Sequence, residues 1–274
     1  FGAEVIKIET NAHEGSRRVG VRPDGAPGPN VDGLFNDANT GKLSLRIDLR
    51  TEDGKNLVRR LVSVSDIVTN NFRPGAMDRM GLSYESLAEI NPRIILMNVP
   101  GCGKNGPWSQ VRTLGNMIMA ASGLNSITGF SGRPPSGMGV AYPDFTTPYV
   151  MVTTVLAALL ERERTGRGQE LNVAQLSATI PLLGLEWMQY GSSGQLPPHR
   201  QNRDPNHCPH GVYPTSGDDE WCAIAVGNDA QWTLLCQLMG RPELAHDPRF
   251  DTHAHRKANE DEIDSLIREW TRGR

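Results

Sequence analysis

The sequence has little cysteine, no long apolar run and almost no net charge. Four cysteines occur among 274 residues and none forms a C-x-x-C pair, which argues against a disulfide framework and favours free thiols in the reducing cytoplasm. No run of about 18 apolar residues is present, so a membrane span is excluded. The net charge of −3 argues against a general binder of nucleic acid. An anionic ligand would therefore need a local cluster of basic side chains.

Several motifs that would announce a chemistry are also missing. The sequence contains neither G-x-S-x-G nor G-x-x-x-x-G-K-[ST]. Its only tight histidine cluster, residues 207–210 (HCPH), spans a proline in an expected loop, where four neighbours cannot easily close a tetrahedral metal site. We therefore expect no metal. The segment 101–106 (GCGKNG) lacks the order of a nucleotide-binding loop and reads as a flexible loop after a strand.

Strand-like and helix-like segments alternate along the first 190 residues. The strand-like segments are residues 3–8, 43–49, 66–69, 93–99 and 169–173. Helical spacing of apolar residues marks residues 51–62, 83–90, 148–164 and 174–190. Ser83 and Thr147 are the expected N-caps of two of these helices, and Thr165–Gly166 is the expected stop of the third. This alternation predicts βαβ units and a parallel, Rossmann-like sheet.

A polar, proline-rich segment at residues 191–206 predicts a linker. It would join a large domain at 1–190 to a small α+β domain at 207–274, with a strand at 221–226 and a helix at 230–239. The sequence opens inside a strand without an initiator Met and stops near an amphipathic helix. We expect that both ends are cut from a longer chain, so that each domain is incomplete.

Asp144 is the strongest candidate for chemistry by its position. It precedes the predicted helix at 148–164 and follows a glycine-rich stretch. A helix N-terminus offers free N–H groups and positive partial charge to a carboxylate, which keeps it ionised, as a nucleophile must be. Spacing alone leaves open whether Asp144 only helps to start the helix.

An ordered set of motifs adds a family resemblance. The motifs are GAEVIKIE at 2–9, N-x-x-K-x-S at 39–44, DIVTNNFRPGAMDRMGL at 66–82, YPD at 142–144, LAALLERERTGRGQELNV at 156–173 and DPRF at 247–250. In this order they are similar to the family III (CaiB/BaiF-type) acyl-CoA transferases. The resemblance covers the whole chain. It implies an α/β fold with a Rossmann-like large domain and a smaller α+β domain, assembled as an interlocked homodimer.

The resemblance also implies a set of site residues. Asp144 falls on the catalytic aspartate of the family, and Lys42, Asn71, Phe72 and Arg79 fall on positions that hold coenzyme A. Asn71 and Phe72 would contact the adenosine or pantetheine portion, and the two cations would answer the phosphates. Coenzyme A and acyl-CoA are then substrates, and no tightly bound cofactor is expected.

Four other positions are less firmly placed by the resemblance. A residue that is often basic in the family is Thr10 here, so Arg17 or Arg18 could supply that phosphate contact. Arg112 could replace a basic residue that some relatives place in this segment. The segment around Gly211 resembles a loop that folds over the active site in relatives.

The implied reaction moves coenzyme A from an acyl-CoA to a free carboxylic acid through a covalent intermediate on Asp144. One alternative is an α-methylacyl-CoA racemase of the same fold, which needs a histidine as second base. The absence of any histidine between His13 and His199 favours transfer. The other alternative is a non-catalytic relative that binds coenzyme A.

Overall fold

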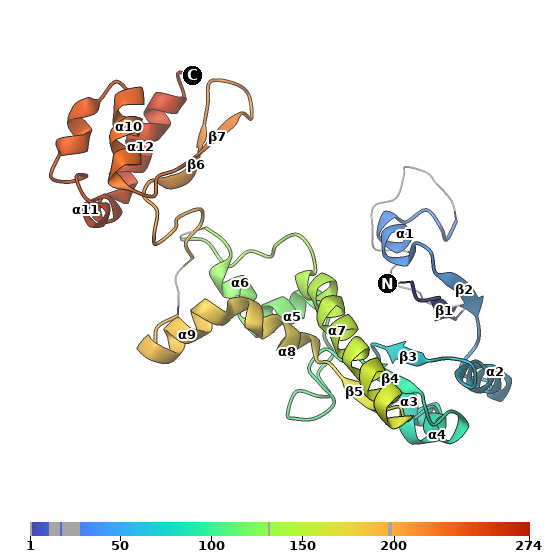
Figure 1. The fold of residues 1–274 in the computed structure, drawn as a ribbon. Helices are drawn as coiled ribbons and strands as arrows, with labels where there is room; N and C mark the ends of the chain where they lie inside the picture. Colours follow the sequence, from blue (N-terminus) through green and yellow to red (C-terminus); the bar gives the residue numbers. More distant parts are fainter. Residues whose placement is uncertain (1, 11–16, 18–27, 131, 197–198) are drawn as a thin grey trace. The chain divides into compact units, whose positions relative to one another are not determined.

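The computed structural model describes residues 2–10, 17, 28–130, 132–196 and 199–274 (Figure 1). The chain divides into two compact units, each assembled from two stretches. The first unit comprises residues 1–122 and 141–182, and the second comprises residues 123–140 and 183–274. The domain boundaries at residues 190 and 207 stay a prediction.

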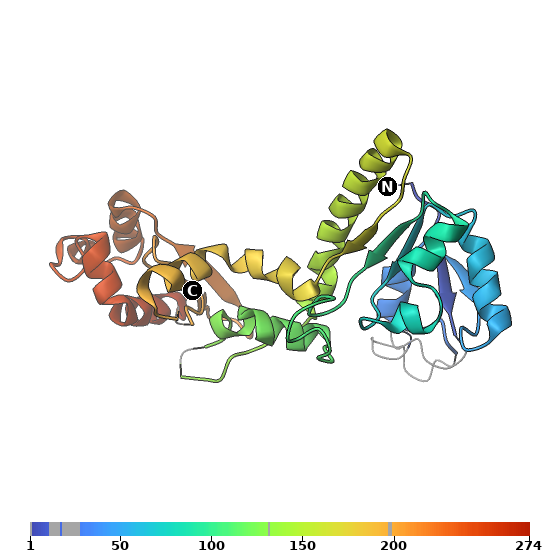
Figure 2. The same cartoon turned by 90° about the horizontal axis from the view of Figure 1, so that it is seen from below.

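All strands of the first unit pair in parallel, as the βαβ pattern of the sequence predicts. They are β1 (Ile6–Glu9), β2 (Leu43–Arg46), β3 (Ile67–Asn70), β4 (Ile95–Asn98) and β5 (Glu170–Asn172). β1 pairs with β2, with Ile6 opposite Leu43, and β3, β4 and β5 form a second ladder with β4 in the middle (Figure 2). The carboxyl ends of β3, β4 and β5 therefore meet at one edge.

The helices of the first unit include several with clear capping residues. The helices are α1 (Gly33–Asn39), α2 (Glu52–Val62), α3 (Ala76–Arg79), α4 (Tyr84–Ile90), α5 (Gly115–Ser122), α7 (Tyr142–Thr165) and α8 (Gln175–Thr179). The side chain of Ser83 caps α4, and Gly166 ends α7 in the left-handed conformation at φ 74°, as the sequence predicts. In the described part of the chain, no helix combines the length and apolar character needed to cross a membrane.

β4 is the centre of the first unit, since its side chains feed two cores. Leu96 belongs to a core that includes Ile47, Val58 and Leu87, between the strands and helices α2 and α4. The next residue, Met97, belongs to another core on which α7 and α8 pack. Successive side chains of a strand point to opposite faces, so helices cover both faces of this sheet. This is the α/β arrangement that the sequence predicts.

The second unit is a small α+β assembly. Its elements are α6 (Leu124–Ile127), α9 (Gly184–Ser193), β6 (His210–Pro214), β7 (Trp221–Ala225), α10 (Asp229–Leu238), η3 (Pro242–His246), α11 (His253–Ala258) and α12 (Glu260–Thr271). β6 and β7 form an antiparallel pair. Cys208, Trp232, Phe250 and Ile263 lie in its core and are fully buried.

The start of α7 corrects the sequence prediction. Thr147 is not an N-cap and Pro148 lies inside the helix, which begins six residues earlier at Tyr142. Pro143 and Asp144 suit a first turn, because proline has no N–H to leave unsatisfied there and a carboxylate is favoured by the helix dipole. Asp144 therefore lies within the first turn of α7 rather than before the helix.

The predicted helix at 174–190 is also divided. It forms α8, a short 3₁₀ helix at Ile180–Leu183 and α9. Pro181 cannot donate to the carbonyl four residues earlier, and Gly184 is a weak helix former. Pro181 and Gly184 therefore explain why the helix is interrupted between Thr179 and Gly184.

Candidate active site

Asp144 lies in the first turn of α7, with its backbone N–H donating to the carbonyl of Ala141 at 2.8 Å. Its side chain is exposed. Because Pro148 has no N–H, the backbone carbonyl of Asp144 receives no bond from the next turn. The carboxylate thus stands at the positive end of a long helix, in solvent contact.

A pocket of about 230 Å³ surrounds this carboxylate in the first unit. Asn71 and Phe72, from the segment after β3, line it together with Asp144. Its wall also includes Arg112, Gly115 and Gln175. The structure thus brings together three of the five site residues that the sequence resemblance implies.

Both oxygens of the Asp144 carboxylate have defined neighbours. Gln175 Nε2, at the start of α8, donates a hydrogen bond to Asp144 Oδ1 at 2.8 Å. On the other side, a Cβ placed on Gly115 would lie 2.4 Å from Asp144 Oδ2. The carboxylate and the start of α5 therefore fit together only because residue 115 has no side chain.

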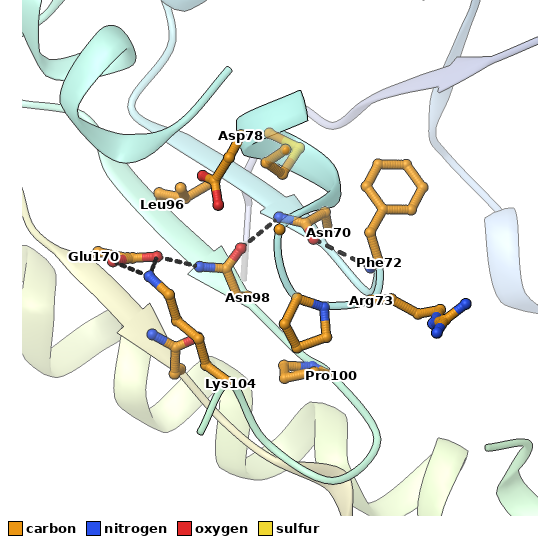
Figure 3. Close-up of a pocket in the computed structure, with 13 residues that line it drawn as sticks. Asn70, Phe72, Arg73, Asp78, Leu96, Asn98, Pro100, Lys104 and Glu170 are labelled. Atoms are coloured by element: carbon orange, nitrogen blue, oxygen red, sulfur yellow. Dashed lines mark hydrogen bonds and ion pairs between the residues drawn. The ribbon is translucent and has the colours of Figure 1, made fainter. Parts of the chain in front are cut away.

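A chain of hydrogen bonds crosses the adjoining edge of the sheet (Figure 3). Phe72 N donates to Asn70 Oδ1 at 3.1 Å, and Asn70 Nδ2 donates to Asn98 Oδ1 at 2.7 Å. Asn98 Nδ2 donates in turn to Glu170 Oε1 at 2.9 Å, and Lys104 Nζ donates to both oxygens of Glu170 at 2.7 and 2.8 Å. The chain links the ends of β3, β4 and β5 and fixes the backbone of Phe72.

This chain lines a smaller pocket of about 30 Å³, which shares Phe72 and Arg73 with the pocket at Asp144. The hydrogen bonds that Lys104 donates to Glu170 raise the pKa of Lys104, because they stabilise its charged form. The cation and the carboxylate are therefore paired at neutral pH, and the chain ends on a satisfied charge.

Lys42 and Arg79 do not line either of these two pockets. Lys42 Nζ donates to the carbonyl of Ala38 at 2.8 Å and to Asn39 Oδ1 at 3.1 Å. Arg79 is the last residue of α3 and is exposed. Their contact with coenzyme A stays a prediction.

The less firmly placed positions have different outcomes. Arg17 forms an ion pair with Glu9 at 2.8 Å and its guanidinium stacks 3.5 Å from the ring centre of Phe35. Arg18 lies outside the described residues. The segment around Gly211 is not a loop, because residues 210–214 form β6 and pair with β7. Within β6 the side chain of Val212 is exposed and that of Tyr213 is buried, as expected of neighbours on opposite faces of a strand.

Gln175, Gly115 and the chain through Asn98 were missed at the sequence level. Gln175 comes shortly after the strand predicted at 169–173. Asn70 and Asn98 lie at the carboxyl ends of two strands that the sequence predicts to be parallel. The signal available for Asn98 and Asn70 was their place at strand ends, since the carboxyl ends of parallel strands face a common site. No such signal existed for Gly115, whose role is a close approach across 29 residues of chain.

Fold and site together define an α/β protein with an exposed carboxylate on the wall of a pocket, at the carboxyl edge of a parallel sheet. The profile of CoA-transferase family III matches residues 1–274, and the chain belongs to this family. The succinyl-CoA–D-citramalate CoA-transferase of Chloroflexus aurantiacus is 38% identical over 99% of this chain and 66% of its own length. The succinate–glutarate CoA-transferase of Agrobacterium fabrum is 36% identical over 97% and 67%.

A solved structure has the same fold. The crystal structure of a CaiB/BaiF family protein from Brucella suis matches with a TM-score of 0.90 and 36% identity, over 100% of this chain and 72% of that one. The chain spans about two thirds of the length of the two curated relatives.

Proposed function

We propose that this protein transfers coenzyme A from an acyl-CoA donor to a free carboxylic acid, with Asp144 as the covalent nucleophile. The observation that carries the proposal is the position of the Asp144 carboxylate, in the first turn of α7 and on the wall of a pocket of about 230 Å³. Membership of CoA-transferase family III supports it. The lack of histidine between His13 and His199 favours transfer over two-base racemisation.

The proposed reaction consists of four attacks on carbonyl carbons. The Asp144 carboxylate attacks the donor thioester, forming a mixed anhydride and releasing the coenzyme A thiolate. The thiolate attacks the aspartyl carbon, forming an aspartyl-CoA thioester and releasing the donor acid. The acceptor carboxylate then attacks the same carbon and expels the thiolate, which finally takes the acceptor acyl group and frees Asp144. Each step exchanges one bond for another without a net proton transfer.

Coenzyme A would lie along the segment after β3. Asn71 and Phe72 line the pocket that holds Asp144, and the exposed ring of Phe72 offers an apolar surface to the adenosine or pantetheine portion. Lys42 and Arg79 would bind phosphates. In this proposal coenzyme A is a substrate and no cofactor is resident. The interlocked homodimer and the cytoplasmic location are part of the same proposal.

The acceptor we propose is a dicarboxylic acid. Two arginines, Arg73 and Arg112, line the same pocket as Asp144. Arg73 donates a hydrogen bond to the carbonyl of Gln110 at 3.2 Å, whereas Arg112 forms no side-chain ion pair with the described residues and is the better candidate to bind a substrate carboxylate. A guanidinium in this position can bind the second carboxylate while the first one reacts. The names of the two curated relatives include citramalate, succinate and glutarate, all dicarboxylic acids, which supports this class.

Replacement of the nucleophile tests the main proposal. Asp144→Ala should lower CoA transfer from succinyl-CoA to a dicarboxylic acid by about 10⁴-fold or more, because no group remains to form the covalent intermediate. Mass spectrometry of the intact wild-type protein, mixed with donor alone, should show one coenzyme A added at Asp144. Asp53→Ala is a matched control, since Asp53 also lies exposed in the first turn of a helix, α2. Normal transfer by Asp144→Ala would exclude the mechanism.

Replacement of the pocket cation tests the acceptor class. Arg112→Met should raise the KM for succinate or glutarate by about 10- to 100-fold, the loss of one charge-assisted contact, and should leave the KM for butyrate unchanged. Arg60→Met is the control, because Arg60 is exposed on α2 and does not line the pocket. An equal effect on both acceptors would assign Arg112 to coenzyme A instead.

A further inference from the structure

Gln175 is held in place by the backbone around it. Its N–H donates to the carbonyl of Pro100 at 3.1 Å, and the N–H of Leu176 donates to that of Gly101 at 2.9 Å. These bonds attach the start of α8 to the segment that follows β4. The side chain therefore extends from an anchored position, and its amide reaches Asp144 Oδ1 at 2.8 Å.

The two oxygens of Asp144 have unequal surroundings. Oδ1 accepts the hydrogen bond from Gln175, and within the described residues no other side chain donates to this carboxylate. Beside Oδ2 lies Gly115, which has no side chain. Oδ2 packs against Gly115 but accepts no side-chain hydrogen bond from the described residues, so its lone pairs are available to attack a substrate, whereas Oδ1 is held by the amide of Gln175.

This assignment gives the Gln175 amide a chemical consequence. Once Oδ2 has been acylated or replaced by sulfur, Oδ1 is the carbonyl oxygen of the aspartyl anhydride or thioester. Each attack on the aspartyl carbon then places a full negative charge on Oδ1. A donor fixed at Oδ1 stabilises that charge more strongly than it stabilises the neutral intermediates, which is the condition for accelerating a step.

We propose that Gln175 is a catalytic residue whose Nε2–H stabilises the oxyanion on Asp144 Oδ1 when the aspartyl carbon is attacked. The inference rests on the proposed function. In one such step the thiolate sulfur bonds to the aspartyl carbon and the donor carboxylate leaves. In the other, an acceptor carboxylate oxygen bonds to that carbon and the thiolate leaves. In the remaining two attacks the oxyanion forms on a substrate oxygen, which Gln175 does not contact.

The test follows the discharge of the covalent intermediate. The protein is incubated with succinyl-CoA until it carries coenzyme A on Asp144, is desalted and is mixed with glutarate. The loss of bound coenzyme A is measured by rapid quench and mass spectrometry of the intact protein. Gln175→Leu should discharge about 100-fold more slowly than wild type, the usual effect of one lost oxyanion donor. Gln237→Leu, the same change at an exposed glutamine of α10, should discharge normally.

A second variant separates a donor from a structural contact. A carboxyl group in Gln175→Glu can donate only while it is protonated. Discharge by this variant should therefore be faster at pH 5 than at pH 8, relative to wild type at each pH, whereas Gln175→Leu should show no such recovery. Loss of packing alone would not depend on pH in this way. If Gln175→Leu does not fold, this pH profile carries the test.

The possible outcomes separate a failure of the role of Gln175 from a failure of the proposed CoA transfer. Discharge by Gln175→Leu at the rate of Gln237→Leu would overturn the inference while the adduct itself upholds the proposed function. A pH profile of Gln175→Glu identical to that of wild type would also overturn it. A wild-type protein that never acquires coenzyme A on Asp144 would overturn both.

Discussion

The Asp144 carboxylate, the nucleophile that we propose, depends on a neighbouring residue that leaves room for it. This residue is Gly115, because a Cβ at this position would lie 2.4 Å from Asp144 Oδ2 and 2.5 Å from the Cβ of Ala141. Its φ lies outside the left-handed region, so the requirement concerns space and not backbone conformation. The demand for glycine thus comes from the neighbouring carboxylate.

Gly115→Ala should therefore displace the Asp144 carboxylate while the fold is retained. We expect CoA transfer to fall by about 100-fold, the size of effect that follows a displacement of about 1 Å in a reacting group. Steady-state transfer measures the activity, and far-ultraviolet circular dichroism checks the fold. Gly191→Ala is the matched control, since a Cβ there meets open space within helix α9. Equal activity of both variants would show that Asp144 tolerates a side chain at 115.

Asp144 itself shows how far residue-level prediction extends. Helix chemistry alone allowed either an anion site or a simple helix-starting role, and the resemblance of motifs predicted the role of nucleophile, which stays a prediction. The partners of Asp144 could not be predicted, because Gln175 is 31 residues away along the chain. Such contacts are set by how α7, α8 and β4 pack, which no local pattern in the sequence records.

At the scale of elements, patterns were reliable where local chemistry decides. The cap at Ser83 and the stop at Gly166 are as the sequence predicts, since each depends on a side chain or a φ angle within one turn. The start of α7 was placed too late because two prolines, Pro143 and Pro148, both suited a first turn. The earlier proline, Pro143, lies in the first turn of the helix, and Pro148 lies inside it.

The hydrogen-bond chain at the sheet edge is a property of several elements together. Asn70, Asn98 and Glu170 come from three strands, and their side chains meet because the strands are parallel and in register, with Asn70 opposite Asn98. The chain ends at the Phe72 N–H, directly beside Asn71. The sheet thus fixes the segment that we propose for coenzyme A, and it does so with groups that are each satisfied.

At the scale of the whole molecule, the two units have separate cores. In the second unit the buried side chain of Arg256 connects several segments through hydrogen bonds. Arg256 donates to the carbonyls of Cys208 and Phe250, both at 3.1 Å, and to Asp229 Oδ1 at 2.7 Å. Its side chain is completely buried, whereas that of Asp229 is exposed. One guanidinium therefore joins the segment before β6, the start of α10 and the segment before α11.

Arg256→Leu should destabilise the second unit by about 3 kcal/mol. The change removes the donor to the carbonyls of Cys208 and Phe250, which then lie buried without a hydrogen bond. The thiols of Cys208 and Cys236 report this directly. Both belong to the same core, and burial raises the pKa of each to about 11, so alkylation at pH 8 requires opening of that core. Alkylation in rising urea should label the two thiols at a single midpoint, and the variant should lower that midpoint by about 1–2 M.

Asp229→Asn provides the matched control. It keeps an oxygen acceptor for Arg256 at an exposed position, so its cost should stay below about 1 kcal/mol. Labelling of Cys208 and Cys236 at different urea concentrations would mean that they do not share one cooperative core. An unchanged midpoint in Arg256→Leu would mean that the apolar contacts around Trp232 and Phe250 hold this unit together without the guanidinium. The urea midpoint of Arg256→Leu should therefore lie far below those of Asp229→Asn and wild type. This order follows from burial, since a polar group without a hydrogen-bond partner costs much less free energy where water can reach it.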